Sequence, residues 1–359
     1  MLLELSAQAA VSLNNMSVAC IPVFTNWVNT DGKFQNEMKV RLISLSKVAF
    51  VFPGQGAQKV GMCKDFYDNY ACAKKVFEEA DEALGFSVSK LCFEGPEEDL
   101  RLTKITQPAI LTCSVAALSV MQEHGLQCEI AGGHSLGEYS ALVAAGVMNL
   151  EDAVVAVHKR GEFMQEAVPV GEGAMAAVMG LTPDEIVSVC QQVEKDFGEA
   201  VQAVNFNCPG QIVIAGTTKA VEKAVEALKA AGAKRAVPLP VSAPFHSTLM
   251  KPAAERLKEV LDKIEFRDAK FPIVANVTAE PVVKAEEIRA LLVKQAASPV
   301  KWEMSMRNMI KNGFDTFVEV GPGKTLTGFT RKIDKEMKVL NVEDLASLEK
   351  TLAYFKEVR

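Results

Sequence analysis

One serine in this sequence stands where a nucleophile would be expected. The pentapeptide Gly133-His134-Ser135-Leu136-Gly137 has the pattern G-x-S-x-G and lies between an expected strand, 129–133, and an expected helix, 135–145. A serine on such a strand-to-helix turn presents its hydroxyl at the carboxyl edge of a sheet, near the free N–H groups and the positive dipole of the helix. A Gly-rich turn whose serine only caps the helix is the alternative. The flanking elements favour Ser135 as a nucleophile.

A serine hydroxyl becomes a good nucleophile only when a base accepts its proton, and four histidines are available for that role. His134 is adjacent to the serine, so its side chain should point elsewhere on the turn. His158 falls within an expected helix, and His124 ends one. His246 lies in a loop after the middle part of the chain, where a side chain can be directed into a cleft. A solvated surface histidine is the alternative, but we expect His246 to be the general base.

The sequence offers no clear third member for a lipase-like triad. Such a triad would place Asp or Glu between the serine and the histidine along the chain. Acidic residues are present there, but none stands in a short loop flanked by turns. We therefore expect a dyad in which a backbone or amide carbonyl orients the histidine.

Arg160 is a candidate for binding a carboxylate. It lies in the helix that follows the serine helix, within His158-Lys159-Arg160-Gly161. A fixed guanidinium can bind a carboxylate through two parallel hydrogen bonds. From the residues alone, a solvated helical arginine paired with a nearby glutamate is the better-supported interpretation.

Two glycine-rich loops need separate interpretations. Phe52-Pro53-Gly54-Gln55-Gly56 follows a buried strand, and its glycines would let a backbone N–H approach a developing oxyanion. It is not a dinucleotide-binding loop, because the third glycine of G-x-G-x-x-G would fall on Lys59. The second loop, 321–325, has the sequence Gly-Pro-Gly-Lys-Thr but lacks the leading glycine of a P-loop, since Val318 occupies that position.

The elements that would position these residues alternate between short apolar runs and amphipathic helices. Strands separated by helices predict a mostly parallel sheet covered on both faces, which is a hydrolase-like α/β core. The expected strands are 48–52, 129–133, 271–277 and 316–320, and the expected helices are 64–84, 106–124, 135–145 and 149–168.

Residues 172–241 follow a different pattern. The expected order is strand, helix, strand, strand, helix and strand, at 173–179, 182–197, 200–205, 211–215, 218–231 and 234–241. The order βαββαβ is that of a ferredoxin-like subdomain. We therefore predict a core of residues 47–171 and 242–359 that is interrupted by this subdomain.

The first 46 residues stand apart from the rest. No Lys or Arg precedes Lys33, which argues against a secretory or mitochondrial leader. The apolar stretches are interrupted by Asn14, Asn15 and Pro22, so none is long enough to span a membrane. We expect 1–46 to be a loose extension or an over-long start, with Met38 as a candidate initiator.

Composition narrows the function classes. With 49% hydrophobic and 23% charged residues, the chain has the profile of a globular protein with a substantial core. A net charge of −6 argues against nucleic-acid binding. Eight cysteines without any C-x-x-C spacing predict reduced thiols, no metal site and a cytoplasmic protein.

Taken together, these motifs resemble the malonyl-CoA:acyl-carrier-protein transacylase family of stand-alone bacterial fatty-acid synthesis enzymes. The resemblance covers the chain from about Lys47 to its C-terminus, and several motifs occur in the family's order and spacing. These segments are Phe52–Gly56, Gly133–Tyr139, Arg160 in the following helix, Asn205–Gln211, Pro244–Ser247, Gln295 before Ser298-Pro299-Val300, and Glu319–Gly323.

The resemblance implies a role for each matching residue. Ser135 would take the malonyl group from coenzyme A as an ester, with His246 as base and then acid. The backbone carbonyl of Gln295 would orient His246, which would explain the missing acidic residue. The N–H groups of Gln55 and Leu136 would form the oxyanion hole.

The substrate side follows from the same resemblance. Arg160 would pair with the malonyl carboxylate, and Met175 and Asn207 would line the cleft between core and subdomain. The partners would be malonyl-CoA and holo acyl carrier protein, with no nucleic acid and no membrane. The coenzyme A thioester would be a substrate, so no cofactor and no metal are expected, and we expect a monomer.

Three alternatives stay open at this point. A discrete acyltransferase of a polyketide synthase would share the chemistry and differ in its carrier and acyl group. A serine esterase or acylhydrolase would share the G-x-S-x-G turn and would hydrolyse simple esters without a thiol acceptor. A non-catalytic scaffold is disfavoured, because every proposed catalytic position holds a competent residue.

Overall fold

The computed structural model describes residues 18–28, 34–44, 46–241 and 243–358. The chain divides into two compact units, 1–47 and 48–359. In the first unit, β1 (Val18–Val28) and β2 (Phe34–Ser44) pair antiparallel, with Val18 opposite Ser44. The described part of the N-terminal extension is therefore a two-stranded sheet. Its interpretation as a tail or an over-long start stays a prediction.

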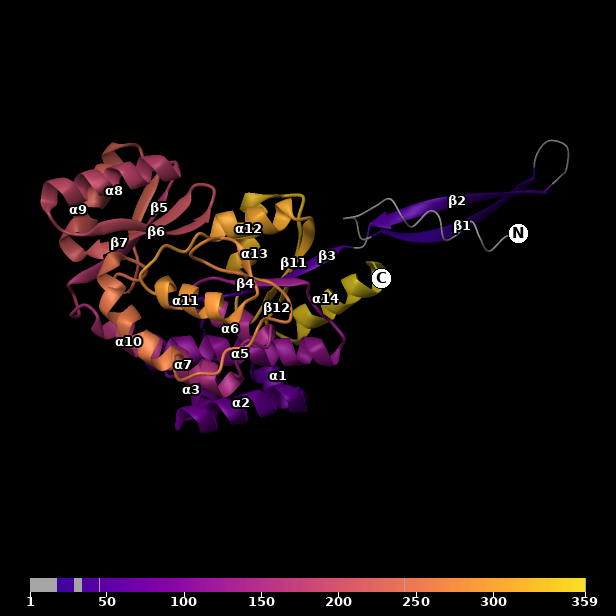
Figure 1. Ribbon diagram of the computed structural model, residues 1–359, viewed down its shortest axis with the longest axis horizontal. Helices are drawn as coiled ribbons and strands as arrows, with labels where there is room; N and C mark the ends of the chain where they lie inside the picture. The colour runs from indigo at the N-terminus through magenta and orange to yellow at the C-terminus, as the bar shows by residue number, and fades with distance from the viewer. Residues whose placement is uncertain (1–17, 29–33, 45, 242, 359) are drawn as a thin grey trace. The chain divides into compact units, whose positions relative to one another are not determined.

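A six-stranded sheet forms the centre of the second unit (Figure 1). Its strand order is β10-β9-β4-β3-β11-β12. The pairs β3/β4, β4/β9 and β11/β12 are parallel, whereas β9/β10 is antiparallel. This arrangement confirms the predicted mostly parallel sheet. The strands are β3 (Lys47–Phe52), β4 (Ile130–Gly133), β9 (Ile273–Val274), β10 (Pro281–Val282), β11 (Phe314–Val320) and β12 (Lys338–Val342).

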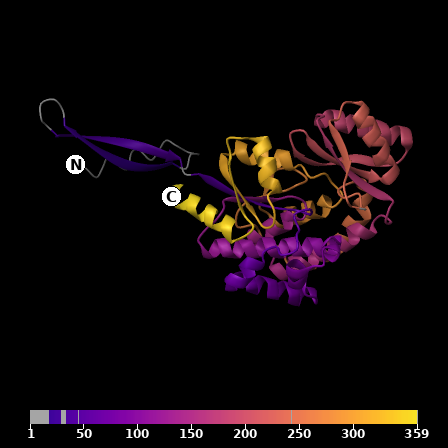
Figure 2. The ribbon, with the colours of Figure 1, turned by 180° about the vertical axis from the view of Figure 1, so that it is seen from behind.

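Both faces of this sheet are buried, because its strands are apolar at consecutive positions. In β3, Phe50 and Phe52 join one hydrophobic cluster, and Ala49 and Val51 join another on the opposite face. Trp302, the first residue of α12 (Trp302–Lys311), belongs to the second cluster. Figure 1 shows α12 and α13 (Thr325–Ile333) on one side of the sheet. The other side is covered by α5 (Thr103–Glu123), α7 (Leu150–Glu166) and α2 (Ala71–Leu84), and Figure 2 shows the same layers from behind.

The covering helices come from both halves of the chain. Before the subdomain they are α1 (Lys64–Asn69), α2 (Ala71–Leu84), α3 (Val88–Glu94), α4 (Glu97–Leu100), α5 (Thr103–Glu123), α6 (Gly137–Ala144) and α7 (Leu150–Glu166). After it they are the 3₁₀ turn η1 (Thr248–Met250), α10 (Lys251–Leu261), α11 (Ala285–Gln295), α12 (Trp302–Lys311), α13 (Thr325–Ile333) and α14 (Leu345–Val358).

One expected helix, 64–84, is wrong as a continuous element. It is broken at Tyr70, whose backbone is extended, with φ −128° and ψ 121°. The Tyr70 hydroxyl lies 3.1 Å from Nε2 of His124 at the end of α5. The break at Tyr70 thus coincides with a contact to a distant segment, which the helical periodicity of 64–84 could not show.

Helix α5 is the central helix of the core. Among the described residues it alone is long and apolar enough to cross a membrane, and 83% of its apolar window is buried within the protein. It packs against α2, α6 and α7. Its apolar surface is therefore used by the core itself.

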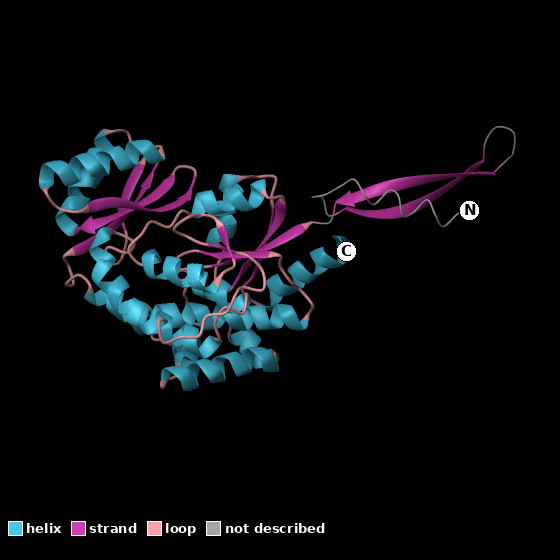
Figure 3. Ribbon diagram, in the orientation of Figure 1, coloured by secondary structure: helices cyan, strands magenta, loops and turns pink. Residues whose placement is uncertain are grey.

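The inserted subdomain is a four-stranded antiparallel sheet with two helices on one face (Figure 3). Its strand order β6-β7-β5-β8 and its chain order confirm the predicted ferredoxin-like unit. The elements are β5 (Gly173–Met179), α8 (Pro183–Phe197), β6 (Val201–Cys208), β7 (Gln211–Thr217), α9 (Thr218–Ala230) and β8 (Arg235–Pro238).

The two faces of the subdomain sheet serve different neighbours. Ala176 and Val178 of β5 pack in a local cluster with residues of α8 and α9. The alternate residues Met175 and Ala177 belong to the large cluster of the core instead. The strand period of two therefore directs Met175 toward the sheet edge where Ser135 lies.

Candidate active site

Ser135 lies on a tight turn between β4 and α6. Its φ is 54°, a left-handed conformation that few residues other than glycine adopt. The flanking glycines make the turn possible, because a Cβ on Gly137 would lie 2.1 Å from the carbonyl oxygen of Phe52. A Cβ on Gly133 would lie 1.9 Å from the carbonyl carbon of Gly137. The G-x-S-x-G pattern is therefore required by the close approach of three backbone segments.

His246 faces Ser135 from the loop that follows the subdomain. Its Nε2 lies 2.7 Å from Oγ of Ser135. His246 also has a left-handed backbone, with φ 65°. Such a conformation costs of the order of 1–3 kcal/mol per residue and persists only where the surrounding structure enforces it. Nucleophile and base are thus both held on strained backbone.

The second nitrogen of His246 fixes its tautomer. Nδ1 lies 2.9 Å from the backbone oxygen of Gln295, the last residue of α11. A carbonyl oxygen only accepts, so Nδ1 carries the proton and Nε2 accepts from the Ser135 hydroxyl. Burial, followed by the positive charge of Arg160, lowers the pKa of His246 to about 3. The imidazole is therefore neutral at physiological pH and free to take a proton.

Arg160 is buried beside the pair, with 1% of its surface exposed. Nη2 donates to Oγ of Ser135 at 3.1 Å and to Oε1 of Gln295 at 2.9 Å. Nη1 donates to Oε1 of Gln107 at 2.7 Å, and the buried Nε has no hydrogen-bond partner among the described residues. In the described part of the chain, the hydrogen-bond partners of this guanidinium are all uncharged. Arg160 is a buried cation that lacks a contacting anion, so the solvated arginine favoured from the residues alone is wrong.

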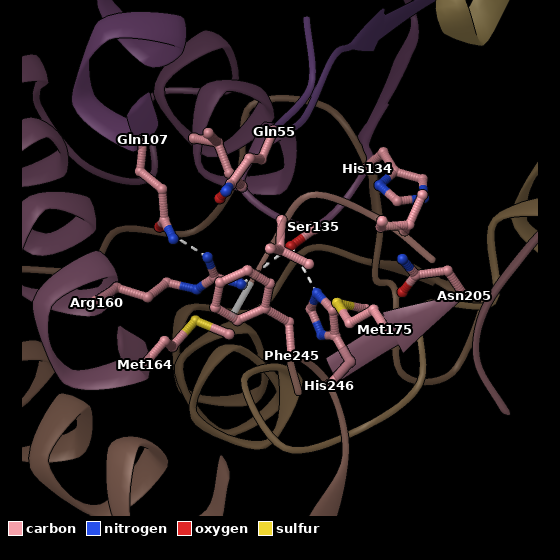
Figure 4. Close-up of a pocket in the computed structure, with 13 residues that line it drawn as sticks. Gln55, Gln107, His134, Ser135, Arg160, Met164, Met175, Asn205, Phe245 and His246 are labelled. Carbon is pink, nitrogen blue, oxygen red and sulfur yellow. Dashed lines mark hydrogen bonds between the residues drawn. The ribbon is translucent and has the colours of Figure 1, made fainter. Parts of the chain in front are cut away.

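A cavity of about 110 Å³ opens onto these groups (Figure 4). Figure 4 shows Ser135 between Arg160 and His246. Polar groups converge on one part of the wall, and Met164, Leu239, Val241 and Phe245 make the rest apolar. The space suits a short acyl group with one charged end.

Most of the expected site residues meet at this cavity. Gln55, Leu136 and Met175 line it together with Ser135 and the base. In the described part of the chain, the backbone N–H groups of Gln55 and Leu136 have no hydrogen-bond acceptor within the protein. Both donors are therefore available to a ligand.

Asn207 is placed differently from the expectation. The cavity is lined by Asn205 of β6 and not by Asn207, which lies two residues further along the strand. The amide oxygen of Asn207 lies 2.8 Å from Nε2 of His134. The ring of His134 is thus held by the subdomain and lies apart from the Ser135–His246 pair (Figure 4).

Three site residues were not found from the sequence. Gln107 of α5 holds Arg160, and Asn276 accepts from the N–H of Ser135 at 2.7 Å. Glu138, in the first turn of α6, is buried and accepts from Nε2 of Gln295 at 2.8 Å. Only Glu138 carried a sequence signal, since it directly follows the G-x-S-x-G turn.

The arrangement supports acyl transfer through a serine ester. It provides a hydroxyl, a neutral base and a cation beside a small cavity, together with two backbone donors that have no acceptor among the described residues. No group of three or more His, Cys, Asp or Glu side chains in the described residues could hold a metal ion.

Known proteins are similar to most of this chain. The acyl transferase domain family matches residues 49–351. The chain is similar to a malonyl CoA-acyl carrier protein transacylase of Bacillus subtilis, with 50% identity over 313 residues, which is 87% of this chain and 98% of the relative.

Two solved structures have the same fold. One is a malonyl CoA-acyl carrier protein transacylase from Clostridium perfringens, with a TM-score of 0.84 and 46% identity over 87% of this chain and 98% of the other. The second is a malonyl-transacylase in complex with a type II polyketide synthase acyl-carrier protein, with a TM-score of 0.84 and 46% identity over 86% of this chain and 100% of the other.

Proposed function

Because the chain belongs to the malonyl CoA-acyl carrier protein transacylase family, we propose that Ser135 carries the malonyl group through both halves of the reaction. The enzyme transfers malonyl from malonyl-CoA to acyl carrier protein.

The first half of the reaction loads Ser135. Oγ attacks the thioester carbonyl while His246 Nε2 takes the hydroxyl proton. The N–H groups of Gln55 and Leu136 stabilise the oxyanion. When the C–S bond breaks, the coenzyme A sulfur takes the proton from His246 and leaves as a thiol.

The second half reverses these steps with a different thiol. The phosphopantetheine thiol of the carrier gives its proton to His246, and its sulfur attacks the serine ester. The ester C–O bond breaks and Oγ of Ser135 recovers the proton. The carbonyl of Gln295 holds the imidazole in one orientation throughout, as a carboxylate does in a triad.

Arg160 selects the malonyl group, and its lack of a contacting anion is the observation that supports this role most strongly. The guanidinium is buried, and among the residues that the structure describes its hydrogen-bond partners are uncharged and its Nε–H has no partner. A buried charge is costly unless it is paired. The malonyl carboxylate supplies a negative charge in direct contact and accepts a hydrogen bond from the Nε–H group.

The same pairing strengthens the base. Burial and the charge of Arg160 together lower the pKa of His246. A carboxylate bound to Arg160 offsets that charge, so the pKa of the imidazole rises when the correct acyl group is present. Selection therefore acts on the chemical step as well as on binding.

The proposal extends to the pathway, the oligomeric state and the compartment of the enzyme. The enzyme supplies malonyl groups for fatty acid elongation, acts as a monomer and is cytoplasmic. Free thiols at seven cysteines of the described residues support a reducing compartment. A carrier of the polyketide type is the alternative, favoured by the similarity to the polyketide transacylase complex.

The test is the intact mass of the protein after incubation with malonyl-CoA, with Ser135→Ala as the control. We expect one malonyl adduct in the wild type, none in the variant, and discharge of the adduct by holo acyl carrier protein. Coenzyme A release by hydrolysis without an adduct would favour an esterase. Comparing discharge by a fatty-acid carrier and a polyketide carrier separates the two acceptors.

A further inference from the structure

Glu138 is a buried carboxyl group that the reaction steps above do not use. It lies in the first turn of α6, three residues after the nucleophile, with 3% of its surface exposed. One oxygen, Oε2, accepts two hydrogen bonds, from the backbone N of Asn276 at 3.1 Å and from Nε2 of Gln295 at 2.8 Å.

These two partners hold the reacting groups in place. Asn276 accepts from the N–H of Ser135 at 2.7 Å and donates to the carbonyl of Gly133 at 2.7 Å. Gln295 holds His246 through its backbone oxygen, and its Nε2 also donates to the backbone oxygen of Ser135 at 2.8 Å. A single carboxyl oxygen therefore anchors both the serine turn and the support of the base.

Glu138 is also joined to Arg160 through one amide group. Arg160 Nη2 donates to Oε1 of Gln295, and Nε2 of the same amide donates to Glu138. The two opposite charges are therefore neighbours across Gln295 without direct contact. In the free enzyme they compensate each other, but a malonyl carboxylate adds a second negative charge to the same buried region.

The surroundings make this carboxyl able to take up a proton. Burial raises the pKa of Glu138 to about 7, although Gln295, Asn276 and Arg160 act in the opposite direction. The other titratable groups of this region are Tyr139 on the same helix, His134 on the serine turn and His246 on the opposite loop. Arg160 is the only cation among the groups that influence Glu138 in the described residues.

We propose that Glu138 determines acyl-group selectivity as the counterion of Arg160, and that it takes up a proton when the malonyl carboxylate replaces it in that role. The proposal rests on the binding of malonyl by Arg160. One proton from solvent adds to Oε1, so Oε2 keeps both accepted hydrogen bonds. The proton returns to solvent when the malonyl group leaves for the carrier.

Glu138→Gln separates charge from geometry. The glutamine amide oxygen can replace Oε2 and accept the same two hydrogen bonds, whereas the side chain can neither ionise nor take up a proton. Glu319→Gln is the matched control. Glu319 is another buried carboxyl whose pKa burial raises to about 7, but it accepts from the N–H groups of Leu326 and Thr327 at the start of α13.

The decisive measurement is calorimetric titration of the Ser135→Ala protein with malonyl-CoA in buffers of different ionisation enthalpy. At pH 7.5 we expect uptake of about half to one proton per malonyl-CoA. Acetyl-CoA, which lacks the carboxylate, should give an uptake close to zero. Adding Glu138→Gln should abolish the uptake with malonyl-CoA, and adding Glu319→Gln should leave it unchanged.

A second measurement uses the active enzyme. The kcat/KM for malonyl transfer should fall about tenfold from pH 6.5 to 8.5 in the wild type and in Glu319→Gln, as Glu138 ionises. In Glu138→Gln the same range should be flat. A purely structural Glu138 would lower kcat/KM in the variant equally at every pH.

Three outcomes would overturn the proposal. Uptake that persists in Glu138→Gln would place the proton on another group of this region, such as His246. Equal uptake with acetyl-CoA would show that the carboxylate is not its cause. If kcat/KM in Glu138→Gln kept the pH dependence of the wild type, Glu138 ionisation would not be its cause. If malonyl-CoA does not acylate the wild-type enzyme at all, the proposed function fails instead, and the mass measurement shows this separately.

Discussion

In the ferredoxin-like subdomain each element follows from its own residues. Thr182 and Glu185 form a capping box at the start of α8, and Thr217 caps α9. The strand β5 alternates between the local cluster and the core, as its period of two requires. Propensity, caps and pattern all indicate the same structure.

At the edge of the large sheet around Ser135, several residues adopt conformations or environments that their types disfavour. Ser135 and His246 both have positive φ, and Glu138 is buried as a carboxyl. Arg160 is buried and contacts no anion in the part of the chain that the structure describes. Each feature costs free energy when considered alone. The difference between the regions shows that the core concentrates its locally unfavourable choices where acyl transfer takes place.

Glycine substitutions should give the largest contrast between the two regions. Gly137→Ala places a Cβ 2.1 Å from the oxygen of Phe52, so we expect a loss of more than about 4 kcal/mol or no folded protein. Gly210→Ala, in the β6–β7 turn, meets nothing within 4 Å and should cost only about 1 kcal/mol despite its φ of 75°. Urea denaturation measures both.

A folded, active Gly137→Ala protein would contradict the tight turn inferred for Ser135. Equal losses in Gly137→Ala and Gly210→Ala would show that the contact of the new Cβ with the Phe52 oxygen does not set the cost at Gly137. The Ser135 turn would then give no support to the difference between the two regions.

Removing the buried cation should have the next largest effect, on activity. Arg160→Ala leaves the malonyl carboxylate unpaired, at a cost of about 3–5 kcal/mol, which is roughly a hundred-fold or greater loss in kcat/KM. Acetyl transfer should gain relative to malonyl transfer. Competition between malonyl-CoA and acetyl-CoA measures the ratio directly.

The same variant should move the pH dependence of acyl transfer. Because Arg160 contributes to lowering the pKa of His246, its removal should shift the acidic limb of the acetyl-transfer profile to higher pH. An unchanged malonyl preference in Arg160→Ala would contradict the assignment of this residue.

The smallest effect is expected at a cap in the subdomain. Thr182→Ala removes the side-chain acceptor of the Glu185 N–H and should lower the free energy of unfolding by about 1 kcal/mol. Thr182→Ser keeps the hydroxyl and should restore most of it. The kcat/KM for malonyl transfer should stay at the wild-type value in both, and a fall would show that the subdomain helices influence the site.

The subdomain and the active site also differ in how much of their structure could be predicted from the sequence. The βαββαβ subdomain and its α8 cap are local, so their residues were sufficient to place them. Ser135 and His246 could be found because a motif and a scarcity of histidines identified them. Gln107 and Asn276 could not be found, because an amide in a helix or loop shows nothing of the partner it will meet.

Boundaries were wrong where tertiary contacts replaced local preference. The strand expected at 271–277 is only Ile273–Val274, since β9 pairs for two residues at each of its edges. The strand β12 was not expected, although Lys338–Val342 pairs along five residues with β11. Both lie near the edges of the sheet, where pairing depends on distant segments more than on composition.

The insertion of a whole subdomain between Ser135 and His246 also sets when the site can exist. His246 follows Ser135 by 111 residues along the chain, and Gln295 follows Ser135 by 160 residues. At 5–20 residues per second, a ribosome needs about 8–32 s to add the last of these after the serine. The nascent chain therefore carries its nucleophile without a base while the subdomain is synthesised. Catalytic competence should arrive late, as one event, when the returning chain closes these long loops.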